Sequence, residues 1–320
     1  MRVLATGGAG YVGSHCVRAL KRAGHEVEIL DDLSRGHREF AAKLNAPLHV
    51  VDLRDGAATE KLLRKGYDAV MHFAAFALVG ESVEKPTLYW GVNFEGGLNL
   101  LRAMRLAKTK RLVVSSTAAV YGEPRETPIP EDAPHAPCNP YGATKLAFEF
   151  ALRAEANATG LRYTALRYFN ASGASDEGDL GERHDPETHL IPRLVQAARK
   201  GEPFTLYGSD HATRDGSCLR DFVHVEDLAR AHVLALAKLD KSPERALNLG
   251  TGTGQTVLEV VTAAERVLGK KIAIDRRPRR PGDPALLVAD ASRAERALGW
   301  KAERTLEDSI RSAERFLARG

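Results

Sequence analysis

The chain has 320 residues, enough for two domains with sizeable cores, and its 43% hydrophobic and 28% charged residues are ordinary for a soluble globular protein. The formal net charge is only +4, and acidic and basic residues alternate along most predicted helices, so no block typical of nucleic-acid-binding proteins is present. No apolar stretch approaches the roughly 20 residues that a membrane-spanning helix needs, and we expect neither a nucleic acid nor a membrane as a partner.

The first predicted strand, Arg2–Thr6, begins at once and leaves no room for a signal peptide, so the expected location is cytoplasmic. The three cysteines are odd in number and widely spaced: Cys16, Cys138 and Cys218. This spacing argues against a disulfide framework and against a cysteine-based metal site. We therefore expect no metal in the site.

Short apolar stretches alternate with longer stretches of helical spacing through the first half of the chain. The predicted strands cover residues 2–6, 26–31, 48–53, 69–74, 111–117 and 163–169, and the longest helical patterns cover residues 87–107 and 141–158. This alternation is typical of a parallel sheet covered by helices on both faces. The sequence therefore predicts a Rossmann-like, doubly wound α/β fold.

The pattern changes after Asn170. Residues 171–186 are rich in Gly, Asp, Ser and Glu and indicate a loop. The elements predicted after this loop are helices over residues 189–200, 225–239 and 257–268 and strands over residues 204–207 and 246–250. Thr305 and Asp308 form a capping-box-like start to a last amphipathic helix. We expect an NAD-binding domain over residues 1–170 and a smaller α/β domain over residues 171–320, with residues from about 221 to 250 packing back on the first.

A glycine-rich loop follows the first predicted strand and opens a helix. Gly8, Gly10 and Gly13 match the GxGxxG dinucleotide fingerprint, and Gly7 adds a fourth glycine. Glycines let the backbone approach a pyrophosphate at the helix N-terminus. Asp31 ends the second strand about 20 residues further on, where a carboxylate binds the adenosine ribose hydroxyls and repels a 2′-phosphate. The loop therefore predicts NAD as the cofactor.

Residues near this loop leave alternatives open. Arg35 and Arg38 are close enough to Asp31 in the chain to suit a 2′-phosphate instead. Asp52, at the end of the third strand, could accept a hydrogen bond from the adenine amino group or could be a turn or cap residue. Phe73-Ala-Ala75 ends the fourth strand with small residues, which suits a backbone lying against the cofactor or simply core packing.

Tyr141 and Lys145 are four residues apart in a predicted helix, so they share one face. A free tyrosine has a pKa of about 10 and is a poor base at neutral pH. A nearby ammonium group and the positive nicotinamide ring of an oxidised dinucleotide would both favour the phenolate. The pair suits a base that deprotonates a substrate hydroxyl while a hydride leaves for the cofactor. An exposed helix face is the alternative, but behind a dinucleotide loop we prefer the catalytic interpretation.

Motifs along essentially the whole chain resemble the extended short-chain dehydrogenase/reductase family and, within it, the UDP-glucose 4-epimerases (UDP-galactose 4-epimerases). They are GGAGYVGSH, LDDLSRGH, HFAA, VGESVEKP, SSTAAVYG, NPYGATK, LRYFNASGA, HLIP, LRDFVHVEDLA, LNLGTGTG and RRPGD. The resemblance implies an NAD-dependent isomerase that interconverts UDP-glucose and UDP-galactose at C4 through a transient 4-keto sugar. NAD would then be a bound, recycled cofactor.

The resemblance also implies roles for individual residues. Tyr141 would be the acid/base, Lys145 would bind the nicotinamide ribose, and Thr117 would hold the sugar 4-hydroxyl. The implied cofactor contacts are Gly7, Gly10, Tyr11, Val12, Gly13, Asp31, Asp32, Ser34, Asp52, Leu53, Phe73, Ala74, Ala75, Asn93, Thr117, Tyr141, Lys145 and Phe169. The implied substrate contacts are Thr117, Tyr141, Asn170, Leu190, Thr205, Leu206, Tyr207, Arg220, Arg280, Asp283 and Leu287. Among these, Arg220 and Arg280 would grip the diphosphate, since guanidinium forks match phosphate oxygens.

The chain departs from the family pattern at several positions. Ala77 stands where relatives often have a lysine that reaches the cofactor, and Val92 precedes Asn93 where an Asn-Asn pair is frequent, so we expect weaker polar contacts to NAD. Near the hexose, Leu287 is intermediate in size and leaves open whether an N-acetyl group fits. A 4-epimerase of UDP-N-acetylhexosamine or UDP-pentose is the main alternative, and a catalytically silent NAD sensor is a further one.

The family usually forms homodimers by pairing the helices that correspond to residues 87–107 and 141–158 into a four-helix bundle. We therefore expect a homodimer. The apolar residues available for the contact are Tyr89, Leu98, Leu101, Phe148 and Leu152, although burial within one subunit explains them equally well.

Overall fold

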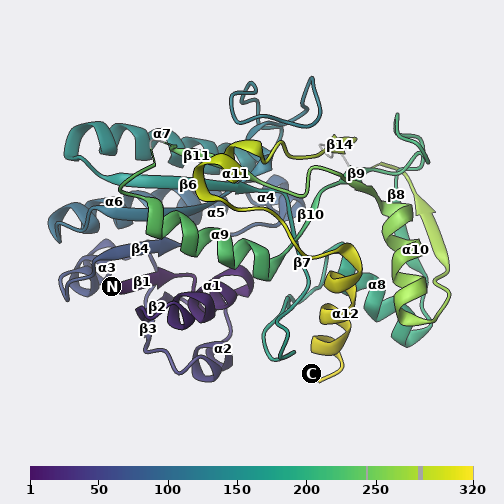
Figure 1. Cartoon of the computed structure of the whole chain (residues 1–320), viewed down its shortest axis with the longest axis horizontal. Helices are drawn as coiled ribbons and strands as arrows, with labels where there is room; N and C mark the ends of the chain where they lie inside the picture. The colour runs from purple at the N-terminus through teal and green to yellow at the C-terminus, as the bar shows by residue number, and fades with distance from the viewer. Residues whose placement is uncertain (243, 280–283, 320) are drawn as a thin grey trace.

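The fold is built around a seven-stranded sheet, seen in a computed structural model that describes residues 1–242, 244–279 and 284–319. The strand order is β11-β6-β5-β4-β1-β2-β3, and every neighbouring pair is parallel (Figure 1). The strands are β1 (Arg2–Thr6), β2 (Glu26–Asp31), β3 (Leu48–Val50), β4 (Ala69–His72), β5 (Arg111–Thr117), β6 (Arg162–Tyr168) and β11 (Ala246–Leu249). The predicted doubly wound α/β fold is confirmed.

Helices cover both faces of the sheet because alternate strand residues point to opposite sides. On β1, Val3 and Ala5 enter one apolar cluster, while Leu4 enters another. The first cluster lies under α1 (Tyr11–Arg22) and α9 (Val225–Lys238), which pack side by side in Figure 1. The second lies under α3 (Gly56–Leu63), α6 (Gly96–Leu106) and α7 (Pro140–Thr159). Burial of apolar area on two faces is the main stabilising contribution.

The long helix predicted over residues 87–107 is divided into three pieces. These are α5 (Pro86–Tyr89), a π-helical turn η1 (Trp90–Glu95) and α6. Glycines explain where it changes: a Cβ on Gly96 would lie 3.1 Å from Leu53, and one on Gly97 would lie 2.6 Å from the Phe148 ring. The wide π turn keeps the direction of the helix but rotates the side chains of α6 relative to those of α5. A helix with a regular period of 3.6 residues does not allow this rotation.

The two helices that the sequence assigned to a dimer contact bury most of the residues proposed for it. Tyr89, Leu101, Phe148 and Leu152 are each at most 5% exposed within one subunit, so the core explains them. Only Leu98 of that set is exposed, at 38%.

A third apolar cluster occupies the C-terminal part of the chain, at the right of Figure 1. It joins α8 (Leu190–Lys200), α10 (Val257–Leu268) and α12 (Leu306–Leu317) to β8 (Phe204–Tyr207) and β13 (Ile274–Arg277). The capping box predicted at Thr305 and Asp308 is confirmed at the start of α12. Short strand pairs connect the two parts: β7 (Asn170–Ser172) with β10 (Phe222–His224), and β9 (Leu219–Arg220) with β12 (Gln255–Thr256) and β14 (Leu286–Leu287).

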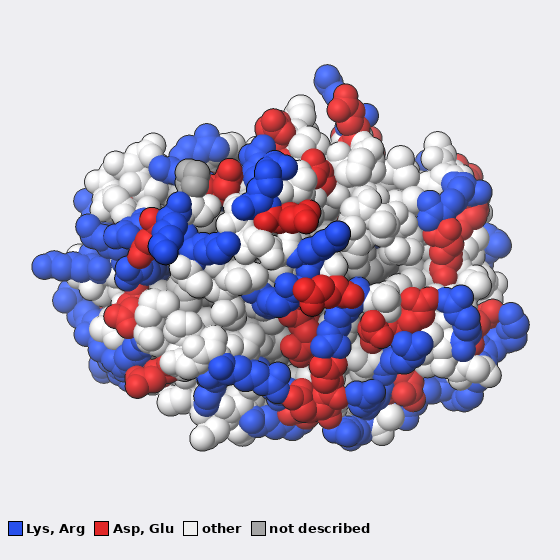
Figure 2. All heavy atoms as spheres, viewed as in Figure 1, with Lys and Arg blue, Asp and Glu red and all other residues white. Residues whose placement is uncertain are grey.

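Four further short helices complete the described elements, namely α2 (Arg38–Lys43), α4 (Val79–Glu84), the 3-10 turn η2 (Ala118–Val120) and α11 (Ser292–Leu298). In the part of the chain that the structure describes, no helix is both long and apolar enough to cross a bilayer. Figure 2 shows basic and acidic side chains interspersed over one face of the molecule.

Candidate active site

The predicted catalytic and cofactor residues meet at the carboxyl edge of the sheet. Gly7 follows β1, Asp31 ends β2, Thr117 ends β5 and Phe169 follows β6. Because the strands are parallel, all of these strand ends lie on the same side, which is where α/β sheets bind their ligands.

The glycine loop packs so tightly that side chains are excluded at two of its positions. Gly7 has φ +70°, and a Cβ there would lie 2.4 Å from the Ala74 nitrogen. A Cβ on Gly13 would lie 2.2 Å from the Gly7 oxygen. Gly10 is different: its backbone (φ −83°, ψ −178°) suits any residue, and the one contact that its Cβ would make is at 3.3 Å to the Gly7 oxygen. Space is therefore kept open at Gly10, where α1 begins without a side-chain cap.

Asp31 faces this loop from the next strand. Its carboxylate accepts hydrogen bonds from the Ala9 N–H (3.0 Å) and the Leu33 N–H (2.9 Å), and the side chain is buried. Burial raises the pKa of Asp31, and the two backbone donors lower it. Beside it, Asp32 accepts from the N–H (2.9 Å) and hydroxyl (2.6 Å) of Ser34 and so shapes the turn after β2.

The Arg35 guanidinium is not available to bind a ligand phosphate near Asp31. It forms an ion pair with Glu81, with its Nη2 2.9 Å from both carboxylate oxygens. A site with Asp31 directed at the loop and Arg35 neutralised fits the ribose hydroxyls of NAD better than a 2′-phosphate.

The Asp52 carboxylate is bound by Arg54, two residues further along the chain. It accepts from the Arg54 N–H at 2.8 Å and pairs with the Arg54 guanidinium at 2.6 Å. The hydrogen bonds from Arg54 lower the pKa of Asp52. This arrangement matches the turn alternative for Asp52, while Leu53 is buried in the core. A role at the adenine stays a prediction for both residues.

The end of β4 lies against the glycine loop, and Asn93 holds the segment that follows it. The N–H groups of Phe73 and Ala74 both donate to the Thr6 oxygen. The Asn93 carboxamide accepts from the Phe76 N–H (2.8 Å) and donates to the Phe76 oxygen (3.0 Å) and the Thr144 hydroxyl (3.1 Å). Both of its amide hydrogens are therefore used inside the protein, which makes Asn93 a support for this segment in the observed conformation.

Tyr141, Thr117 and Lys145 come together at the end of β5. Asn139 caps α7 by accepting from the Gly142 N–H at 2.9 Å, with Pro140 at the first position, and this fixes Tyr141 in the first turn. Thr117 acts on the Tyr141 phenol by lowering its pKa, and its own hydroxyl accepts a hydrogen bond from the Ala119 N–H at 3.1 Å. One turn further, the Lys145 ammonium donates to the Ser115 oxygen of β5 at 2.9 Å. The spacing predicted from the sequence thus directs both side chains toward the same strand.

The electrostatics of this group differ from the simple expectation that an ammonium activates the phenol. Burial raises the pKa of Tyr141, and the Thr117 side chain lowers it. Burial lowers the pKa of Lys145 to about 8, and the Glu149 carboxylate opposes that shift. Lys145 donates to the Ser115 carbonyl in this conformation, so Thr117 and not Lys145 is the polar side chain that favours the phenolate.

A buried ion pair that the sequence analysis did not identify lies beneath Lys145. Glu149 is one turn further along α7 and forms a bidentate pair with Arg167 of β6, at 3.0 and 2.5 Å. Ser116 donates to the same carboxylate at 2.5 Å, and Arg167 also donates to the Tyr121 hydroxyl at 2.9 Å. Glu149 and Arg167 are both buried, so removal of either one would leave the charge of the other without a partner in the core. The four-residue spacing from Lys145 to Glu149 is the signal that could have indicated this group.

The predicted substrate residues lie on β7, β8, β9 and β14 and at the start of α8. Asn170 is on β7 beside Phe169, and Leu190 opens α8. On β8, Leu206 is in the core, and Thr205 and Tyr207 are half-buried. Arg220 of β9 is paired in register with Leu287 of β14, which packs against the cluster formed around Tyr121. Arg280 and Asp283 lie outside the described residues.

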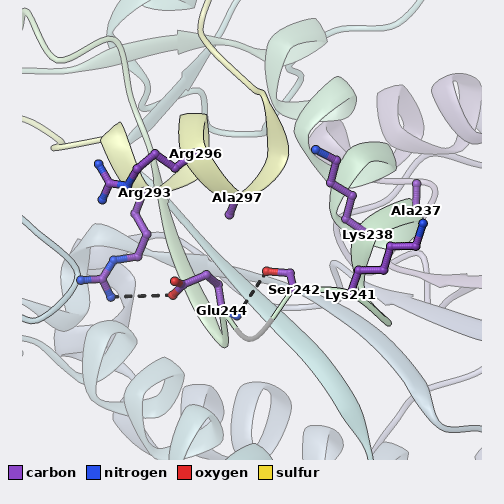
Figure 3. Close-up of a pocket in the computed structure, with 8 residues that line it drawn as sticks. All are labelled: Ala237, Lys238, Lys241, Ser242, Glu244, Arg293, Arg296 and Ala297. Atoms are coloured by element: carbon purple, nitrogen blue, oxygen red, sulfur yellow. Dashed lines mark hydrogen bonds and ion pairs between the residues drawn. The ribbon is translucent and has the colours of Figure 1, made fainter.

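A hollow of about 500 Å³ lies at the other end of the sheet and contains none of the predicted site residues. It is lined by Ala237, Lys238, Lys241, Ser242, Glu244, Arg293, Arg296 and Ala297 (Figure 3). These residues precede β11 or belong to α9 and α11, so the hollow is at the amino ends of the strands. The charged groups point in different directions, and Glu244 lies 3.9 Å from Arg293.

The residues at the carboxyl edge fit NAD. The open corner at Gly10, the uncapped start of α1 and the buried Asp31 carboxylate match what a pyrophosphate and an adenosine ribose require. Tyr11 and Val12, both expected among the cofactor contacts, lie in the first turn of α1. The Tyr11 hydroxyl donates to the Gly173 oxygen at 2.6 Å and so joins this turn to the second part of the chain.

Comparison with known proteins agrees with this geometry. Residues 3–250 match the NAD dependent epimerase/dehydratase family. The UDP-glucose 4-epimerase of Lactobacillus helveticus is 47% identical over 313 residues, covering 97% of this chain and 94% of that protein.

Two solved structures are similar over the whole chain. The Stenotrophomonas maltophila UDP-glucose-4-epimerase with bound NAD and formylated UDP-arabinopyranose has a TM-score of 0.95 and 40% identity, covering 100% of this chain and 98% of its own. The Bifidobacterium longum UDP-glucose 4-epimerase in complex with NAD+ and UDP has a TM-score of 0.95 and 38% identity, with the same coverage. The chain therefore belongs to the NAD dependent epimerase/dehydratase family, is an NAD-dependent isomerase, and has the UDP-glucose 4-epimerases as its relatives.

Proposed function

We propose that this enzyme interconverts UDP-glucose and UDP-galactose by inverting the configuration at C4 through a 4-keto sugar. The observation that carries the proposal is the placement of Tyr141 and Lys145, one helical turn apart on α7, beside the Thr117 end of β5 and at the same sheet edge as the glycine loop. A proton acceptor at this edge is what oxidation of a sugar hydroxyl requires.

In the first half of the reaction, Tyr141 accepts the proton of the 4-hydroxyl while the hydrogen on C4 departs as a hydride, leaving a ketone. NAD, when bound, supplies the reversible hydride acceptor for this step. Thr117 is placed to hydrogen-bond the reacting oxygen, and Lys145 fixes the end of β5 through Ser115. In the second half, the hydride returns to the opposite face of C4 while Tyr141 gives its proton back to the oxygen, so the protein ends as it began.

The UDP group must be held firmly while the hexose turns over. We assign the cofactor to residues 1–170 and the UDP group to residues 171–320. Arg220 is suited to the diphosphate because it is buried and its guanidinium is oriented by the Leu219 oxygen at 2.8 Å. Asn170 supports the same assignment, since none of the described residues hydrogen-bonds its carboxamide and it follows Phe169 at the strand edge. Arg280 and Asp283 are assigned by resemblance alone.

A second candidate is a 4-epimerase of UDP-pentoses or UDP-N-acetylhexosamines. The observation that favours it is the position of Leu287, which packs against the cluster of Ala118, Val120 and Tyr121 that follows Thr117. A side chain this close to the reacting end decides how much room C2 and C5 substituents have. The Stenotrophomonas maltophila relative was solved with a UDP-pentose derivative.

The test is proton NMR of the purified enzyme with UDP-galactose, UDP-N-acetylgalactosamine and a UDP-pentose in separate tubes, without added NAD. Conversion of UDP-galactose alone supports the first proposal and also shows that the enzyme retains NAD despite Ala77 and Val92. Faster conversion of the UDP-pentose or of UDP-N-acetylgalactosamine than of UDP-galactose supports the second proposal. If no sugar reacts even when NAD is supplied, both proposals fail and a silent NAD-binding protein becomes the better interpretation.

We propose a cytoplasmic homodimer as the working form. Four large apolar side chains of η1, α6 and α7 are exposed: Trp90, Leu98, Leu106 and Phe150, with Phe150 at 52%. Because α6 and α7 pack on each other, their outer sides form one continuous surface. Burial of this surface against a second copy would remove it from water.

A further inference from the structure

The loop that precedes α8 brings two histidines and two glutamates together. Glu182, His184, Glu187 and His189 each direct one nitrogen or oxygen into a group whose atoms all lie within 4.8 Å of one another. The loop follows the bridge between Ala174 and Gly181 and ends at His189, the N-cap residue of α8.

The hydrogen bonds inside this group are incomplete. His189 Nδ1 lies 3.0 Å from a carboxylate oxygen of Glu187 and 3.0 Å from one of Glu182, and its hydrogen bond goes to Glu187. The Glu182 side chain is only 6% exposed, yet no described residue donates a hydrogen bond to it. His184 Nδ1 is also buried without a hydrogen-bond partner, 3.7 Å from each carboxylate.

Glu187 also accepts hydrogen bonds from the backbone N–H groups of Thr188 (2.8 Å) and His189 (2.9 Å), so Glu182 is the carboxylate of this group that lacks a donor among the described residues. A buried carboxylate without a donor is costly, so a divalent cation would satisfy Glu182 and the unpartnered Nδ1 of His184 better than the present contacts do.

We propose that Glu182, His184, Glu187 and His189 form a binding site for one divalent transition-metal ion, with Zn²⁺ as the best match. Imidazole and carboxylate ligands suit Zn²⁺, whereas Ca²⁺ and Mg²⁺ prefer oxygen ligands alone. Tetrahedral Zn²⁺ with bonds near 2.0–2.1 Å places its ligand atoms about 3.4 Å apart. The separations of 3.0 and 3.7 Å lie on either side of that value, and the whole set lies within 4.8 Å, so the more distant ligands would move inward on binding.

The ion would have a structural role. Four protein ligands fill a tetrahedral Zn²⁺ site and leave no position for substrate. The loop contacts the turn after β2, because the His37 ring nitrogen lies 3.0 Å from the Arg183 oxygen. Binding would fix the segment between that turn and Leu190, the first residue of α8. We expected no metal from the sequence because we considered cysteine ligands, and this set contains none.

The test is Zn²⁺ titration of the full-length, untagged enzyme by calorimetry after dialysis against a chelator. We expect one Zn²⁺ per chain and a higher unfolding temperature with the metal. Glu182→Gln and His184→Ala should each weaken binding by more than the roughly 10- to 100-fold that loss of an outer partner costs. His49→Ala is the matched control, because His49 pairs with Glu28 at 2.7 Å away from this loop and its loss should leave Zn²⁺ binding unchanged.

Glu182 is buried, so circular dichroism must first show that Glu182→Gln folds. His184 is half-exposed and provides the second variant if it does not. Bound Co²⁺ gives an independent readout through the visible absorption of its tetrahedral complexes, which His184→Ala should abolish. Absence of saturable Zn²⁺ binding, or wild-type affinity in a folded His184→Ala protein, would overturn the proposal and leave the group as an ion-pair cluster.

Discussion

The glycine loop allows a graded test of where the dinucleotide lies. A Cβ on Gly13 would lie 2.2 Å from the Gly7 oxygen, and real Cβ contacts begin near 3.0 Å, so Gly13→Ala must displace the loop or α1. Overpacking of this kind costs about 1–3 kcal/mol. In contrast, Gly10→Ala meets the Gly7 oxygen at 3.3 Å in a backbone conformation that alanine adopts freely. Its Cβ occupies the corner assigned to the pyrophosphate.

The two variants should therefore separate stability from binding. Gly13→Ala should lower both the unfolding temperature without ligand and the NAD affinity. Gly10→Ala should change stability by less than about 1 kcal/mol but weaken NAD at least tenfold, or about 1.4 kcal/mol. Gly80→Ala, in the exposed part of α4 with nothing within 4 Å, should change neither. Thermal unfolding and calorimetric NAD titration of the cofactor-stripped proteins measure both quantities. Wild-type NAD affinity in a folded Gly10→Ala protein would refute the placement.

Three further predictions concern the groups around the site. Burial lowers the pKa of Lys145 from 10.5 to about 8, so this group destabilises the fold by about 3 kcal/mol below pH 8, and the penalty is relieved as the pH rises toward 10. Lys145→Met removes this penalty, so its stability relative to wild type, measured by thermal unfolding, should be greatest at pH 7 and least at pH 10. A stability difference between the two proteins that does not change with pH contradicts this. Glu149→Leu and Arg167→Met should each cost about 3–5 kcal/mol, while the double variant costs much less than their sum. Additive losses in urea unfolding would show that the pair is not coupled. Phe150→Glu should shift the enzyme from dimer to monomer in analytical ultracentrifugation, and an unchanged mass would place the contact elsewhere.

The central sheet could be predicted because its strands are short apolar runs bounded by helical patterns. β1, β2 and β5 match their predicted ranges, as do β8 and α10. The family and the NAD cofactor were also predicted correctly. The glycine loop between β1 and α1 and Asp31 at the end of β2 can be recognised from short stretches of sequence alone. Tyr141 and Lys145 could be placed on one helix face for the same reason: their geometry depends only on a four-residue spacing.

Other features depend on contacts between distant segments. The π turn at η1 keeps the helical direction, so residues 87–107 retain a continuous helical pattern in the sequence. Strands of two residues, such as β9 and β14, are too short to show any period. Arg167 is a charged residue in an apolar strand, and its partner Glu149 is known only once β6 and α7 are packed together. The ion pair between Asp52 and Arg54 likewise could not be predicted without knowing where the two side chains lie.

The most direct test of the proposed chemistry is turnover of UDP-galactose by Tyr141→Phe, followed by proton NMR beside the wild type. The substitution keeps the ring and removes only the hydroxyl whose pKa Thr117 lowers. The proposal predicts that the variant folds, binds NAD and UDP, and converts substrate at least about 10²- to 10⁴-fold more slowly. Wild-type turnover in Tyr141→Phe would remove Tyr141 from the reaction and contradict the mechanism.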